Sequence, residues 1–325
     1  MKGLKKIALV TAIAAAPFAA HADLKALDDS TMGNVTGQAG VTIELETRVS
    51  IGEFTYKDEG TFAVSGIELG GSSVSSSDSG RTNPLGGELL DNLKIDIDIA
   101  DDGDAIIHVG SLQTYDHDGD PGTPEQPAPI DWGMTAQSME LRGNNNEKTT
   151  LISNLDAWGN LGALDIRVDT DDVAGYADSG TLNLDAAFTV EEMSFNADFL
   201  ALGVSGMSIK SSEASGAKIG ADGLAAIFGE IDPDTGDVTV TAEAQRKIGL
   251  AQAGFAIVSL DVYKGNNLAA AGSVNAKSDV LRVDVTDVLM DINIAETTIG
   301  GTNIGTIGID NLHISDTRLA VYGKD

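Results

Sequence analysis

Strict alternation of apolar and polar residues is the feature that most constrains the fold of this 325-residue chain. In "VTIELETRVSIG", from Val41 to Gly52, apolar side chains occupy every second position, with one interruption near Arg48. "LKIDIDIA", from Leu93 to Ala100, repeats the pattern with Lys and Asp between the apolar residues. Successive side chains of a β-strand point to opposite faces of its sheet. A period of two therefore predicts strands with one buried face.

The alternation returns along the rest of the chain, and clusters of Gly, Asp, Asn and Ser separate the alternating segments. These residue types are typical of turns. "DPDTGD", residues 232–237, predicts a tight turn between two strands. Residues 214–228 and 242–250 are the two segments in which a helix is an alternative to a strand, but their internal glycines weaken a helical prediction. The chain is therefore predicted to be all-β.

Short related units recur along the chain. "FAVSGIEL" at residues 62–69 and "LGVSGMSI" at 202–209 share a Val-Ser-Gly core. "LLDNLKI", "LISNLDA" and "GIDNLHI" share an Asn-Leu core at residues 89–95, 151–157 and 308–314. Gly and Asn tolerate positive φ, so each unit predicts a corner or bulge. Repeated corners favour an elongated β-solenoid or β-roll, and they also suit a large antiparallel β-sandwich.

The N-terminus has the three parts of an export signal. Lys2, Lys5 and Lys6 precede an apolar run at residues 7–20, and Ala-His-Ala at 20–22 fits a signal-peptidase site. The apolar run is shorter than the roughly 20 residues of a transmembrane helix, and no later segment is apolar enough to be one. We expect a Gram-negative exported protein of the periplasm, the outer membrane surface or the extracellular space.

Three segments follow from this interpretation. Residues 1–22 are predicted to be a cleaved signal peptide, residues 23–40 a flexible N-terminal extension, and residues 41–325 one continuous β-rich domain. Cleavage removes three of the 20 basic residues and none of the 50 acidic ones, which changes the formal charge from −30 to −33. So acidic a surface excludes nucleic acid as a partner. The chain has no cysteine, so it contains no disulfide.

One acidic loop is a candidate calcium site. It lies in "TYDHDGDPGTPEQPAPIDWG", residues 114–133, whose composition predicts a surface loop. Asp116, Asp118 and Asp120 alternate around Gly119, and carboxylates in that spacing can converge on one hard cation. The glycine position does not match an EF-hand. The alternative interpretation is a solvated acidic turn.

Residues for catalysis are few. His108, His117 and His313 are the histidines beyond the predicted signal peptide. The chain has no nucleophile-elbow motif, no phosphate-binding loop and no dinucleotide fingerprint. Trp132 and Trp158 are too few to form a carbohydrate-stacking ladder. We expect a protein that is not an enzyme and that has no cofactor, apart from the candidate calcium ion.

The segment at residues 27–60 carries a resemblance to a known family. "VTGQAG" at residues 35–40 follows an acidic lead-in and runs into the first alternating strand. This arrangement resembles the start of the exported gammaproteobacterial FilA-like family of pilus-system proteins. The resemblance implies a role in the cell envelope or in a surface appendage, and it implies no active site.

Two functions are expected from these features. The first is an exported, non-enzymatic envelope or surface protein that is structural, adhesive or pilus-associated. Its partners would be other envelope or pilus proteins, or copies of itself, with residues 27–51 as an intermolecular strand on an exposed sheet edge. The alternative is an envelope binding module whose β-groove or barrel holds a lipid or another apolar ligand.

Overall fold

A large antiparallel sheet dominates the computed structural model, which describes residues 40–72, 88–115, 126–145, 147–173, 176, 179–211, 219–231 and 237–323. The main sheet has 12 strands, and every strand pairing in it is antiparallel. The all-β prediction is confirmed. The predicted signal peptide and residues 23–39 of the predicted extension lie outside the described residues. In the described part of the chain, no helix is long and apolar enough to cross a membrane.

Four long strands run through the whole sheet: β9 (Lys148–Asp169), β10 (Thr181–Ala197), β15 (Val280–Ile299) and β16 (Thr302–Val321). Strand β9 pairs with β10 and β15 pairs with β16 along most of their lengths. Shorter strands complete the sheet beyond β9 and between β10 and β15. The sheet therefore consists of two half-sheets that share the four long strands.

The first half-sheet has the order β2-β3-β8-β9-β10-β11-β15-β16. Its short strands are β2 (Val49–Lys57), β3 (Thr61–Gly70), β8 (Ile130–Arg142) and β11 (Leu202–Lys210). The second half-sheet has the order β1-β4-β5-β9-β10-β14-β15-β16. Its short strands are β1 (Val41–Thr47), β4 (Leu90–Ile99), β5 (Ala105–Ser111) and β14 (Ala256–Gly265).

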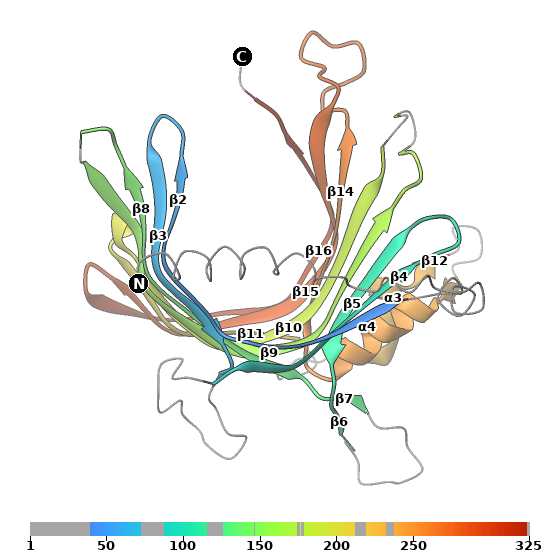
Figure 1. Ribbon diagram of the computed structural model, residues 1–325, viewed down its shortest axis with the longest axis horizontal. Coiled ribbons are helices and arrows are strands. Elements are labelled where there is room, and N and C mark those ends of the chain that lie inside the picture. The colour runs from blue at the N-terminus through green and yellow to red at the C-terminus, as the bar shows by residue number, and fades with distance from the viewer. Residues whose placement is uncertain are drawn as a thin grey trace, which may run out of the picture. The chain divides into compact units, whose positions relative to one another are not determined.

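The predicted corner residues form the bends of this sheet. All five have positive φ inside strands: Gly66 (62°), Asn92 (57°), Asn154 (54°), Gly206 (63°) and Asn311 (57°). The pairing register shifts beside all of them except Gly66. The sheet curves strongly between its half-sheets (Figure 1). The corners therefore bend one continuous antiparallel sheet, rather than joining the coils of a solenoid or two separate sheets of a sandwich.

Buried polar side chains accompany the bend. Asp131 accepts hydrogen bonds from the backbone N–H of Ser72 at 2.7 Å and from its hydroxyl at 2.8 Å. Asn160 donates to the Thr189 hydroxyl, which donates to Glu191 at 3.0 Å. Bulges interrupt the backbone ladder, and buried polar groups need partners. Side chains supply those partners here.

Two helices lie on the convex side of the second half-sheet (Figure 1). They are α3 (Gly220–Phe228) and α4 (Ala242–Gln252). The Thr241 hydroxyl caps α4 by accepting from the Ala244 N–H at 3.1 Å. An internal glycine costs a helix about 1 kcal/mol relative to alanine, and burial offsets this cost. The buried cluster beneath the helices contains Ala163, Ala187, Leu224, Ile248, Ala251, Ile257 and Leu289.

Short elements complete the described chain. Strands β12 (Glu230–Ile231) and β13 (Val238–Thr239) pair antiparallel, as expected for a turn at residues 232–237. Strands β6 (Thr114–Tyr115) and β7 (Gln126–Pro127) pair within the predicted surface loop. That loop ends earlier than expected, because β8 begins at Ile130. A 3-10 turn spans Asp198–Leu200.

Candidate functional site

A row of polar side chains crosses the convex face of the second half-sheet. Its members lie directly opposite one another on successive strands: Thr42, Asp96, His108, Asp165, Asp185, Ser259, Asp287 and Ser315. We call this row the polar rung. It runs through all eight strands, from the β1 edge to the β16 edge. Four of its eight side chains are carboxylates, so the row needs cations or hydrogen-bond donors close to it.

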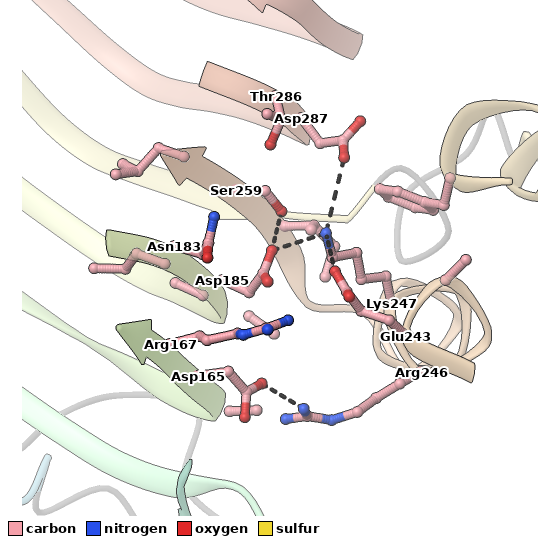
Figure 2. A pocket seen from close by; sticks show the side chains of 18 of the residues that line it. Asp165, Arg167, Asn183, Asp185, Glu243, Arg246, Lys247, Ser259, Thr286 and Asp287 are labelled. Atoms are coloured by element: carbon pink, nitrogen blue, oxygen red, sulfur yellow. Dashed lines mark hydrogen bonds and ion pairs between the residues drawn. The ribbon is translucent and has the colours of Figure 1, made fainter. Parts of the chain in front are cut away.

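Helix α4 places a lysine over the middle of the polar rung (Figure 2). Lys247 Nζ lies 2.8 Å from Asp185 Oδ1 and 3.9 Å from Asp287 Oδ2. It also lies 3.2 Å from Glu243 Oε1, one turn earlier on the same helix. The Lys247 side chain is only 14% exposed. The ammonium group therefore joins two strands to α4 in a largely buried position.

An arginine of α4 occupies the neighbouring part of the polar rung. Arg246 forms an ion pair with Asp165 (Figure 2). His108 Nδ1 lies 2.7 Å from Asp165 Oδ1 on the next strand. The Ser259 hydroxyl donates to Asp185. The acidic groups beneath α4 are thus paired with cations or with hydrogen-bond donors.

The pKa shifts follow from this arrangement. Burial opposes the charge of Asp165, but the hydrogen bond to His108 and the charge of Arg246 outweigh it and lower the pKa of Asp165. Burial likewise opposes the charge of Lys247, and the hydrogen bond and charge of Asp185 reverse the effect and raise the pKa of Lys247. Burial raises the pKa of Asp287, and the nearby charge of Lys247 only partly offsets this effect of burial.

A groove of about 850 Å³ lies between α4 and this face of the sheet. Its lining includes the ion-paired residues, and also apolar side chains such as Phe228 and Leu250. Ser259 is 2% exposed, and its hydroxyl donates to a carboxylate instead of to a basic nitrogen that could activate it. Within the described ranges, no group of three or more His, Cys, Asp or Glu residues is arranged to hold a metal. The cluster has the chemistry of a clamp that fixes α4 to the sheet.

The residues singled out from the sequence have different locations. Asp116, Asp118 and Asp120, the candidate calcium ligands, lie outside the described residues, as does His117. His108 belongs to the polar rung, whereas His313 lies on the edge strand β16. Trp132 lies in strand β8, not in the loop before it.

Sequence reasoning missed Arg246 and Lys247. One signal could have indicated them, because they are the only adjacent pair of basic residues after Lys6 in an otherwise acidic chain. The carboxylates that they contact carry no comparable signal, since aspartate alternates with apolar residues throughout the strands.

The opposite, concave face of the second half-sheet is apolar. Three rows of apolar residues cross it, each formed by residues directly opposite one another, and we call them the apolar rungs. The first contains Val41, Ile97, Ile107, Ile166, Leu184, Leu260 and Val285. The second contains Ile43, Ile95, Val109, Leu164, Ala186, Val258, Val288 and Ile314. The third contains Ile99, Ala105, Val168, Leu182, Val262, Val283 and Leu319.

Six of the 22 side chains of the apolar rungs are exposed, Val288 is buried and the others are half-buried. Val41 is 54% exposed, Ile99 66%, Val168 40%, Leu182 36% and Leu319 49%. Helices α3 and α4 lie against the convex face, so they leave this face uncovered (Figure 1). Contiguous apolar surfaces of this extent on a protein are typical of binding sites.

Comparisons with known proteins give little functional information. A protein-family model described as "Family of unknown function (DUF6160)" matches residues 1–101 of this chain. This matched segment includes β1 to β4. No curated protein and no solved structure matches the chain significantly.

Proposed function

We propose that this protein is an exported, non-enzymatic cell-envelope protein that binds lipid acyl chains on the concave face of its bent sheet. The observation that carries this proposal is the set of apolar rungs with exposed side chains. Covering apolar surface contributes about 25 cal/mol per Å², so an occupant of this face would be held by the hydrophobic effect.

The chemistry of the face favours hydrocarbon over other ligands. The apolar rungs contain Val, Ile, Leu and Ala, with no aromatic ring for stacking and no polar side chain for orienting a sugar, nucleotide or peptide. Strands lie about 4.8 Å apart, so eight strands give a surface roughly 34 Å across. A long, smooth aliphatic surface of this kind suits extended acyl chains.

Curvature argues against a second copy as the occupant of this face. Two identical concave surfaces placed face to face leave a void between them, and protein interfaces require close complementarity. A flexible chain has no such restriction, because it can follow the curvature. The acidic convex face would meanwhile remain in water.

The test compares two lysine substitutions at adjacent positions of β10. Leu182→Lys adds a charge to the third apolar rung, whereas Asn183→Lys adds the same charge to the convex face beside Asp261. Each exported protein is purified from the periplasm without detergent and examined by native mass spectrometry and by organic extraction.

We expect lipid with the wild type and with Asn183→Lys, and roughly tenfold less with Leu182→Lys, because burying an unpaired charge costs well over 1.4 kcal/mol. Equal lipid content in all three proteins would overturn the proposal. Wild-type protein that is purified without lipid would also overturn it. This holds equally if residues 23–39 of the chain itself prove to occupy the concave face.

A second candidate function is a structural, adhesive or pilus-associated role. The observation that favours it is that, among the described residues, no strand pairs with the outer side of β1 and β2 at one edge of the sheet or of β16 at the other. Residues 41–51 of the predicted intermolecular strand belong to this edge, and they already pair with β4 and β3 on their inner side. In the described part of the chain, no strand pairs with their outer side.

A further inference from the structure

We infer that copies of this protein join head to tail, with β16 of one copy pairing with the β1–β2 edge of the next. This interface does not depend on the proposed ligand. It extends the sheet from copy to copy and leaves both faces of the sheet accessible.

Strand direction permits this pairing. Each half-sheet contains eight strands, and all neighbours are antiparallel. An even number of antiparallel strands leaves the first and last strands running in opposite directions. A translated second copy therefore presents β1–β2 antiparallel to β16, the same geometry as every junction inside the sheet.

The two edges are also similar in length, and each bends near its middle. Strands β1 and β2 together cover residues 41–57 and are interrupted at Arg48. Strand β16 covers residues 302–321 and has its corner at Asn311. Both edges thus cross both half-sheets and bend near the middle, although β16 also has positive φ at Gly305 and Asp316.

Side chains at the two edges have the same chemistry. Val41 and Ile43 end the apolar rungs at one edge and are 54% and 42% exposed. Leu319, at the other edge, is 49% exposed. Pairing would continue the apolar rungs from one copy to the next, and it would cover side chains that each copy leaves exposed.

Both edges lack proline and are longer than the very short strands that protect many sheet edges, although bulges interrupt both. Proteins protect edge strands with proline, with inward-pointing charges or with very short strands. Strand β16 has 20 residues and contains neither proline nor lysine. Strands β1 and β2 contain no proline, and their one lysine is the terminal Lys57. These edges are therefore suited to accept another strand.

The test uses two variants that each block one edge with inward lysines. Ile43→Lys with Phe54→Lys blocks the β1–β2 edge, and Ile307→Lys with Leu319→Lys blocks the β16 edge. All four native side chains are at least 42% exposed, so their replacement does not disturb a buried core. Leu182→Lys, on the interior strand β10, is the control for added charge on the same face. Far-UV circular dichroism checks that each protein folds.

Sedimentation velocity and light scattering measure assembly of the exported protein across a range of concentration and salt. We expect a ladder of oligomers for the wild type and for Leu182→Lys, and more assembly at high salt, because salt screens the repulsion between acidic copies. Each edge-blocked variant alone should stay monomeric. Mixed one to one, they should form dimers and nothing larger, since one open edge of each kind remains.

Several outcomes would overturn the inference. A wild type that stays monomeric at every concentration and salt contradicts it. Assembly by either blocked variant alone would indicate a different interface, such as β16 against β16. Because Leu182→Lys is expected to lose lipid and keep assembly, the two measurements distinguish failure of this interface from failure of lipid binding.

Discussion

The backbone N–H of Asn311 donates a hydrogen bond to Oδ1 of Asp291 at 2.6 Å, from the corner of β16 to the neighbouring strand β15. Asn311 has φ of 57°, and the register between the two strands shifts beside it. The shift removes a regular ladder partner, and the Asp291 carboxylate supplies a replacement. Asp291 is 2% exposed, so water cannot readily substitute for it.

Replacing Asp291 with alanine should therefore destabilise the sheet at its bend. We expect Asp291→Ala to lower the free energy of unfolding by about 1–3 kcal/mol, because the N–H of the corner loses its acceptor. Urea denaturation measures the change. Asp310→Ala removes an exposed carboxylate next to Asn311 and is the control, with an expected effect below about 0.5 kcal/mol. Equal effects of the two substitutions would contradict this account of the corner.

Gly66 should be intolerant of even a methyl group. A Cβ at Gly66 would lie 2.5 Å from the Cγ and Cδ atoms of Gln137, and φ there is 62°. We expect Gly66→Ala to lower the free energy of unfolding by about 1–2 kcal/mol. Gly52, on the adjacent strand β2, has nothing within 4 Å of an added Cβ. Gly52→Ala should be neutral or stabilising by up to about 1 kcal/mol, and thermal melting that ranks the two variants in reverse order would refute the argument.

The clamp on α4 should depend on Lys247. In Lys247→Met, Asp185 and Asp287 lose their shared cation in a mostly buried position. We expect a loss of about 3 kcal/mol in the free energy of unfolding, since removing one partner of a buried ion pair leaves an uncompensated charge. Glu243 contacts the same lysine but is 70% exposed, so Glu243→Gln should cost less than about 1 kcal/mol. A Lys247→Met protein as stable as Glu243→Gln would show that the clamp is not structural.

The pH dependence of stability should reflect the opposite pKa shifts of Asp165 and Asp287. The folded-state pKa of Asp165 is lowered from 3.8, so its contribution is present above that pH and is lost as the pH falls through the lowered value. The folded-state pKa of Asp287 is raised from 3.8, so ionisation of Asp287 opposes folding above the raised value.

Two amide substitutions separate these contributions. At neutral pH, Asp165→Asn should destabilise the protein, and Asp287→Asn should be neutral or stabilising. In acid, Asp165→Asn should lose less stability than the wild type does, because it lacks the group whose protonation is unfavourable in the fold. Urea midpoints measured from neutral pH to below pH 3.8 check both expectations. If the stability of the wild type and of Asp165→Asn changed with pH at the same slope, the lowered pKa would not belong to Asp165.

Most of what could be predicted from the sequence concerns single strands. Alternation in "LKIDIDIA" correctly placed a strand at residues 93–99, with isoleucines on one face and aspartates on the other. The Asn-Leu and Val-Ser-Gly units correctly predicted corners, because positive φ is a local preference of Asn and Gly. Both inferences need only neighbours in the chain. They could not show whether the corners stack coils or bend one sheet, because that depends on which strands pair.

The sequence by itself determined the strands, their apolar and acidic faces, and the residues at which they turn, because side-chain period and backbone conformation are local properties. Only the tertiary structure decided that Lys247 meets Asp185 and Asp287. Asp185 lies 62 positions before Lys247 in the chain, and Asp287 lies 40 positions after it. It also decided that weak helical segments become α3 and α4, and that α3 and α4 cover the convex face of the second half-sheet and not its apolar concave face. Those outcomes depend on strand register and on contacts between distant segments, which no local pattern of residues specifies.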